Sequence, residues 1–453
     1  MRYAGPPATP EASGESLPGV TQPWTVPLGL LALLWVLVLF EPDVWLASKG
    51  VLWARKIPLA LYLLLVAFLV PRAMALPRRV WLRPFLLYIV AGSISIPFAE
   101  DTGLALGLVW KTLALYYCLG VATLAFVRSV EKTRLLLLLF LGQFAFWGVQ
   151  ALASEATLDR TTWQPIPWHP LLGNTDGFAP LMVIGMVFSY YSGVATQARR
   201  MRWLAFLTGF LCVIGVVAAF TRGASLAAGL MVLYVLLRST NKRKALIWIG
   251  VVSVVFLIAT NVIYPAGEFW ARLATITSEG TRAGTGGDRW DLWRLGLRVF
   301  TDHPIFGVGA GNFGAYAFYN IAPGELLGKY ALNHWLIYGR VLHSVHMEIL
   351  VEFGLVGFAT YIWMLLDFWK RNVALRSQRL AVPWARVTRG RLDLRNISLG
   401  LEGAMIAFLI TGFFYDQLFV HWLYSLVIVN ALLHATAQRI ARAAHTSLGA
   451  VTG

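Results

Sequence analysis

Charged residues are scarce in this chain of 453 residues, and cysteine is nearly absent. Only 13% of the residues are Asp, Glu, Lys or Arg, whereas soluble domains carry about a quarter. The two cysteines, Cys118 and Cys212, lie within apolar stretches, so neither a disulfide framework nor a cysteine metal site is expected. The sequence also has no His-Glu-x-x-His motif, no P-loop and no pair of catalytic carboxylates. These absences argue against metal-dependent and nucleotide-dependent hydrolysis.

Apolar residues fill most of the chain. They make up 58% of it, and the mean hydropathy is +0.65. The 19 Trp and 16 Tyr suit a protein that meets two membrane–water interfaces. This composition predicts an all-α, polytopic membrane protein in contact with membrane lipids. The formal net charge of +16 comes from short basic clusters between apolar runs. That distribution is typical of orientation signals, so no nucleic-acid partner is expected.

About twelve stretches are apolar enough to span a bilayer, which needs about 20 such residues. They are roughly Trp24–Phe40, Ile57–Val70, Val80–Pro97, Gly103–Val127, Leu135–Ala153, Ala179–Ala195, Trp203–Phe220, Ala224–Leu237, Ala245–Tyr264, Val345–Leu366, Leu399–Phe414 and Leu418–Leu433.

This pattern divides the chain into five parts. Residues 23–264 are expected to hold transmembrane helices one to nine, and residues 343–435 helices ten to twelve. The segment 265–342 between them is predicted to be one large external loop, on the non-cytoplasmic side, with short helices of its own. Residues 1–22 are expected to form a disordered cytoplasmic leader rather than a cleavable signal peptide, because they lack an apolar centre. Residues 436–453 are expected to form a cytoplasmic tail.

The basic clusters fall in alternate loops between the predicted spans. The longest of these loops runs from Lys370 to Arg395. Cytoplasmic loops are enriched in Lys and Arg, so this alternation places both termini in the cytoplasm. It also places Arg222, Arg289 and His343 on the same, non-cytoplasmic side of the membrane.

Two histidines begin the predicted tenth span. Helical spacing would place His343 and His346 on one stripe and Glu348 and Glu352 on another. An imidazole titrates near neutral pH and can take a proton from a hydroxyl group, so His343 is the candidate base. Alternatively, His343 anchors the interface or caps a loop. His346 is interpreted as a packing or hydrogen-bonding neighbour, with substrate contact as the alternative.

Two arginines are candidates for binding an anion. Arg222 is the sole positive group on a short outer hairpin, and its planar donor fork suits phosphate. It could instead snorkel at the edge of the bilayer. Arg289 follows a flexible glycine pair, and Asp288 or Asp291 could simply pair with it.

Three further features carry weaker signals. Lys111 lies inside an apolar span and could bind lipid phosphate, or could snorkel or form a buried ion pair. Asn174 lies in a polar turn and could contact substrate or only shape the turn. The glycines from Gly307 to Gly311 lack the βαβ context of a dinucleotide fingerprint, so they are expected to allow tight turns and close backbone approach.

Three pieces of sequence together resemble the O-antigen ligase superfamily, bacterial membrane glycosyltransferases that also include O-antigen polymerases. They are Thr221-Arg222-Gly223, Arg289 ahead of the segment Asp302–Phe313, and His343 through Gly357. Ser344 stands where the family usually has Asn, and His346 stands where an aromatic residue is common.

The resemblance implies transfer of a glycan from undecaprenyl diphosphate to a hydroxyl of lipid A–core, at the periplasmic face of the bacterial inner membrane. It implies no metal and no cofactor. Arg222 and Arg289 would bind the diphosphate, and His343 would act as the base; a single displacement would invert the anomeric centre. One alternative is a polymerase that extends carrier-linked repeats. Another is a lipid or polysaccharide transporter, although we found no convincing inverted repeat.

Overall fold

The computed structural model of the chain describes residues 22–75, 78–154, 165–170, 172–264, 267–279, 284–376 and 393–449. The regular structure in these ranges is helical, which confirms the predicted all-α fold. The predicted leader, apart from Gln22, and most of the long basic loop after Lys370 lie outside the described residues.

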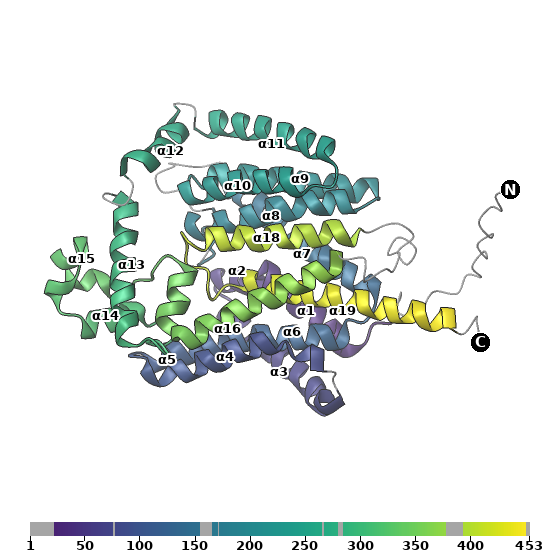
Figure 1. Cartoon of the computed structure of the whole chain (residues 1–453), viewed down its shortest axis with the longest axis horizontal. Coiled ribbons are helices and arrows are strands. Elements are labelled where there is room, and N and C mark those ends of the chain that lie inside the picture. The colour runs from purple at the N-terminus through teal and green to yellow at the C-terminus, as the bar shows by residue number, and fades with distance from the viewer. Residues whose placement is uncertain are drawn as a thin grey trace, which may run out of the picture.

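Twelve helices lie at the twelve apolar stretches, and most of them run along the long axis of the molecule (Figure 1). They are α1 (Val26–Phe40), α3 (Ile57–Leu69), α4 (Arg83–Ser95), α6 (Ala114–Phe126), α7 (Val130–Ser154), α8 (Thr175–Ala195), α9 (Arg199–Ala218), α10 (Arg222–Arg238), α11 (Lys242–Ile263), α16 (Val345–Arg376), α18 (Leu394–Thr411) and α19 (His421–Gly449).

Shorter helices connect these long ones or cover one end of the bundle. In the first half they are α2 (Pro42–Ser48), η1 (Leu52–Lys56), η2 (Val70–Ala75), η3 (Arg78–Trp81), η4 (Ile96–Phe98), α5 (Thr102–Leu106) and the π-helical η5 (Gly107–Leu113). The segment predicted as a large loop holds α12 (Glu268–Glu279), α13 (Gly284–Asp302), α14 (Phe313–Asn320), η7 (Pro323–Glu325), α15 (Gly328–Leu332) and η8 (His334–Ile337). Helices α12 to α15 lie across one end of the bundle (Figure 1).

The protein is a multi-pass membrane protein. Among the described residues, eight helices are long and apolar enough to cross a membrane, and the bent pair α1–α2 could make a ninth. Helices α4, α10 and α19 do not meet the same criterion, so the number of twelve spans stays a prediction. Helix α19 also continues to Gly449, well into the segment expected to be a tail.

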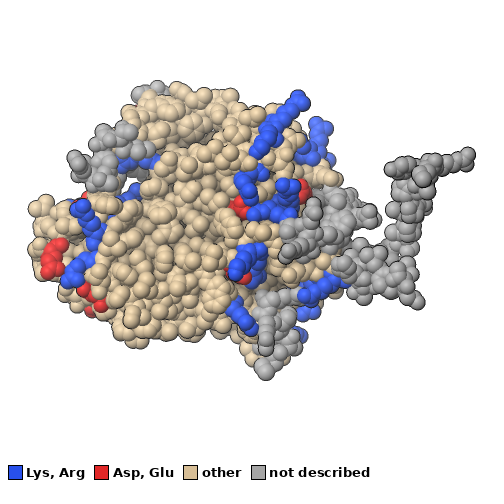
Figure 2. Space-filling view, viewed as in Figure 1, with Lys and Arg blue, Asp and Glu red and all other residues tan. Residues whose placement is uncertain are grey.

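Charge separates along the same axis as the helices. Figure 2 shows Lys and Arg gathered toward two ends of the molecule, with a broad band between them that carries no charge on the visible face. Exposed side chains on the long helices are large and apolar, including Leu63 on α3 and Val254 on α11. Such a band matches the hydrocarbon layer of a bilayer.

Helix α8 lies at the centre of the bundle. In its most apolar window, 89% of the residues are buried, and it packs against α9 and α18. Gly185 allows the close approach to α9, because a Cβ there would lie 2.8 Å from the Cys212 sulfur. Small residues at such contacts let membrane helices pack backbone to backbone. Cys212 is fully buried, in agreement with its predicted packing role.

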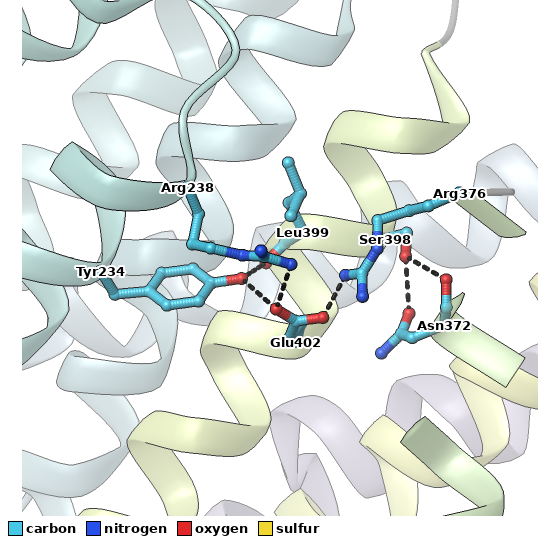
Figure 3. A network of polar contacts seen from close by, with 7 residues as sticks. All are labelled: Tyr234, Arg238, Asn372, Arg376, Ser398, Leu399 and Glu402. Atoms are coloured by element: carbon cyan, nitrogen blue, oxygen red, sulfur yellow. Dashed lines mark hydrogen bonds and ion pairs between the residues drawn. The ribbon is translucent and has the colours of Figure 1, made fainter. Parts of the chain in front are cut away.

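A buried carboxylate connects three helices at the end of the bundle away from α12–α15 (Figure 3). Glu402 of α18 is only 3% exposed. It accepts hydrogen bonds from Arg238 of α10 at 3.1 Å, from Tyr234 at 3.2 Å, and from Arg376 of α16. The two arginines are the last residues of their helices, where cations also interact favourably with the helix dipole.

Helix α16 is interrupted at Gly354, where φ is 64° and ψ is −167°. The interruption leaves helix backbone groups without their usual partners, and the loop from Pro304 to Gly309 supplies them. The amides of Val308 and Gly309 donate to the carbonyls of Val351 and Glu352 at 3.1 and 2.9 Å. This confirms that the glycine segment brings its backbone close to a neighbouring helix.

That close approach also explains the three positive-φ glycines of the loop. Gly307, Gly309 and Gly311 have φ values of 71°, 89° and 70°. A Cβ on Gly307 would lie 2.3 Å from the backbone of Glu352. A left-handed backbone and this lack of space together require glycine.

Candidate active site

Arg222 is the first residue of α10, directly after a tight turn from α9. Phe220 in that turn has a left-handed φ of 54°, and Thr221 is extended before the helix begins. The turn directs the half-buried Arg222 side chain toward α12, where its Nη1 donates to the Thr275 hydroxyl at 2.7 Å. The guanidinium is therefore held at the outer end of the bundle rather than along its lipid-facing surface.

Arg289 lies on α13 and reaches the same place from the other side. Its Nη2 is 3.9 Å from Asp176 in the first turn of α8, and its guanidinium carbon is 5.7 Å from the centre of the Tyr415 ring. The suggested pairing with a neighbouring aspartate is not found for Asp288, which pairs with Lys329 instead. The carboxylate beside Arg289 thus comes from a segment far away in the chain.

The two arginines line one cavity of about 490 Å³. A volume of this size is typical of ligand sites. A third arginine, Arg272, also lines it, and donates to the Phe220 carbonyl at 3.2 Å. Two carboxylates, Asp176 and Glu268, complete the charged lining. With three guanidinium groups against two carboxylates, the lining is net positive and suits an anion.

Tyr415 is one residue at this site that sequence reasoning missed. Its hydroxyl accepts a hydrogen bond from the backbone N–H of Ala224 at 3.1 Å, and burial raises its pKa to about 12. The phenol therefore stays protonated. A tyrosine between two apolar stretches looks like an ordinary interface residue, so no signal in the sequence pointed to it.

His343 lies just outside the helix that it was expected to begin. Helix α16 starts at Val345, and His343 has a left-handed φ of 50°. The proposed stripe that joins His343 to His346 is therefore wrong. Two hydrogen bonds hold the backbone on either side of His343. Trp293 donates to the Leu342 carbonyl at 3.0 Å, and the Val345 amide donates to the Gly412 carbonyl at 2.8 Å.

The surroundings of His343 favour a neutral imidazole. Burial lowers its pKa from the usual 6.5, and the nearby positive charge of Arg289 lowers it further. Asp176 and Asp416 act in the opposite direction but do not reverse the shift. His343 is not among the residues that line the cavity, yet it lies within electrostatic range of Arg289 and Asp176. A neutral imidazole beside a net positive cavity can accept a proton.

The other three candidates are placed differently. His346 faces α18, where its Nε2 lies 3.0 Å from the Leu409 carbonyl and its ring packs against Phe413. Asn174 caps α8, its side-chain oxygen accepting from the Asp176 amide at 3.0 Å. Lys111 is exposed on η5 and does not line the cavity. These positions favour packing for His346 and turn formation for Asn174, while substrate contact by any of the three stays a prediction.

A sequence model of the O-antigen ligase family matches residues 181–362. Over these residues the chain is similar to the O-antigen ligase family. The matched region includes Arg222, Arg289 and His343, whereas Asp176 and Tyr415 lie outside it. This similarity supports a membrane glycosyltransferase of the ligase or polymerase type. No curated protein matches the chain.

Proposed function

We propose that this protein, which is similar to the O-antigen ligase family, transfers a glycan from undecaprenyl diphosphate to a hydroxyl of lipid A–core. The reaction would take place at the periplasmic face of the bacterial inner membrane, with both termini in the cytoplasm. The observation that carries the proposal is the net positive cavity that Arg222, Arg272 and Arg289 line, with His343 beside Arg289.

The arginines are suited to hold the diphosphate of the donor. Guanidinium groups remain charged at all relevant pH values and bind phosphate oxygens in a fork geometry. As the bond between the sugar and the diphosphate breaks, negative charge develops on the leaving oxygen. Donors already fixed in place stabilise that charge without further rearrangement. The hydrogen bonds of Arg222 to Thr275 and of Arg272 to Phe220 fix two of them.

His343 is suited to activate the acceptor. A sugar hydroxyl is a poor nucleophile until it loses its proton, and a positioned base accelerates such a step by roughly 10²- to 10⁴-fold. The lowered pKa of His343 keeps the imidazole available for that proton near neutral pH. Direct attack by the acceptor oxygen on the anomeric carbon would displace the diphosphate and invert the configuration there.

One reconstitution experiment separates the candidate reactions. The purified protein receives a defined polyprenyl-diphosphate glycan, either with lipid A–core or alone. Glycosylated lipid A–core is the expected product, with the anomeric configuration inverted. Lengthening of the carrier-linked glycan instead would identify a polymerase. Movement of intact donor across a vesicle membrane without new glycosidic bonds would identify a transporter.

A matched set of variants tests the assignment of roles. His343→Ala should abolish transfer while donor binding persists, whereas His346→Ala should leave measurable transfer. Full activity of the His343→Ala variant would rule out the base role. Activity should also persist in the presence of a chelator, and strong inhibition would point to a metal-dependent mechanism.

A further inference from the structure

A second cavity, of about 360 Å³, lies at the end of the bundle away from Arg222 and Arg289. It opens between α6, α16 and α19. Its α16 lining begins at Asp367, near the last turns of a helix that starts beside His343. Its α19 lining includes His434. With a helical rise of 1.5 Å per residue, His434 lies roughly 20 Å along the helix from His421, the first residue of α19. The cavity is therefore separate from the candidate active site.

The lining of this cavity has an apolar floor and a basic rim. Val80, Leu124 and Ala431 contribute apolar side chains. Lys370, Arg371 and Arg439 contribute three positive charges, against the single carboxylate of Asp367. A ligand that fills the cavity would thus need an anionic group joined to an apolar part.

The three basic side chains differ in the hydrogen bonds and ion pairs that they make. Arg439 is fixed, because it donates to the carbonyls of Val127 at 2.7 Å and Leu124 at 3.0 Å at the end of α6. Arg371 pairs with Asp367 at 2.7 Å one turn earlier on α16. Lys370 is exposed and makes no hydrogen bond or ion pair within the described part of the chain. Its ammonium can therefore bind a ligand without losing a partner among the described residues.

The outer face of α16 locates the cavity relative to the bilayer. An exposed apolar stripe runs along the helix through Trp363 (46% exposed) and Leu366 (53%) to Trp369 (37%) and Val373 (49%). Such a stripe contacts lipid tails, and tryptophans mark the level where tails give way to headgroups. Lys370 directly follows the last tryptophan of the stripe, so the basic rim lies at headgroup level.

We propose that this cavity binds the phosphate group of an anionic phospholipid. Lys370 and Arg371 would contact the phosphate, and the first part of an acyl chain would lie over Leu124 and Ala431. Basic pockets between membrane helices at this level bind anionic headgroups by the same combination of charge and depth. The proposal does not depend on the transferase activity.

Native mass spectrometry of the purified full chain tests this proposal, with phosphatidylglycerol as the probe. Wild-type protein should retain one phosphatidylglycerol in preference to phosphatidylcholine. Lys370→Ala should weaken that binding roughly fivefold, the factor expected per basic group, and Lys370→Glu by roughly 25-fold. Because the Lys370 side chain makes no hydrogen bond or ion pair with the described residues, both variants should fold.

Arg243→Ala is the matched control. Arg243 is an exposed basic residue at the same end of the bundle, in the first turn of α11, and does not line the cavity. Its loss should leave phosphatidylglycerol retention unchanged. Equal retention by wild-type and Lys370→Glu protein would overturn the proposal. Inorganic phosphate at equal concentration should not compete, and full competition would show that the cavity recognises free phosphate rather than a lipid.

Discussion

The guanidinium of Arg289 lies against the ring of Tyr415, with 5.7 Å between its carbon and the ring centre. The Tyr415 hydroxyl accepts a hydrogen bond from Ala224, two residues after Arg222 in the first turn of α10. One tyrosine side chain thus contacts both arginine-bearing helices at the cavity. It also satisfies an amide that has no acceptor within its own helix.

Two substitutions separate the roles of this tyrosine. Tyr415→Phe keeps the ring but removes the hydroxyl, so it should cost about 1 kcal/mol of stability with donor affinity nearly unchanged. Tyr415→Ala also removes the ring beside Arg289, and should weaken donor binding by about fivefold, as expected for about 1 kcal/mol of cation–π interaction. Isothermal titration with a polyprenyl diphosphate measures the affinity. Equal affinities for the two variants would show that the ring does not position Arg289.

Removal of either cavity arginine should weaken donor binding strongly. Arg222→Ala and Arg289→Ala each remove hydrogen bonds between charged groups, worth roughly 1.5–3 kcal/mol, so the Kd should rise roughly 10- to 100-fold. Lysine at either position keeps the charge but loses the fork, and should recover only part of the affinity. The same titration measures all four variants. An unchanged Kd in the alanine variants would remove their assigned role.

The pH dependence of transfer should report the environment of His343. Its pKa lies below 6.5, so kcat should rise with pH through the acidic range and level off near neutral pH. Arg289→Gln removes a positive charge that lowers this pKa, so the rise should move to higher pH. Asp416→Asn removes a negative charge that raises it, so the rise should move to lower pH. Profiles at saturating donor measure both shifts, and the same direction in both variants would contradict the assignment.

The Glu402 network should contribute strongly to stability. Glu402→Gln leaves the mostly buried Arg376, whose side chain is 14% exposed, without its carboxylate. Breaking a buried ion pair in this way costs about 3–5 kcal/mol, and the exposure of Arg238 places the expected loss near the lower figure. Asp302→Asn is the control, because its pair with Arg298 is exposed and should contribute about 0–1 kcal/mol. Thermal unfolding in detergent measures both; equal losses would contradict the prediction.

The interruption of α16 should require glycine. Gly354→Ala would place a Cβ 2.3 Å from the Ile305 carbonyl oxygen in a backbone conformation that only glycine adopts readily. It should lower both thermal stability and transfer activity. Gly229→Ala in α10 is the control, because a Cβ there meets nothing within 4 Å and alanine favours helix by about 1 kcal/mol. A Gly354→Ala variant as stable as wild type would show that the backbone at the interruption of α16 can adjust to a Cβ.

Hydropathy was sufficient to predict the helices, because an apolar stretch of span length can satisfy its backbone in a bilayer only as a helix. Charge alternation placed Arg222 and Arg289 on one side, and the structure brings them to one cavity. The pairing of Glu402 with Arg376 was not predicted, because no residue near either one in the sequence indicates that their helices meet at this point. The backbone of His343 was also missed, since helical spacing was extended two residues beyond the true start of α16.

On the loop side, main-chain atoms make the hydrogen bonds that join the glycine loop to α16. The amides of Val308 and Gly309 donate to helix carbonyls, and the Gly311 amide donates to the Glu352 side chain at 2.7 Å. Apart from its glycines, the loop can therefore exchange its side chains without releasing the outer portion of the helix that follows His343. Homologues with very different residues between Pro304 and Phe313 would still present the imidazole in the same orientation. The exposed side chains of this loop can diversify while its backbone contacts with α16 stay constant.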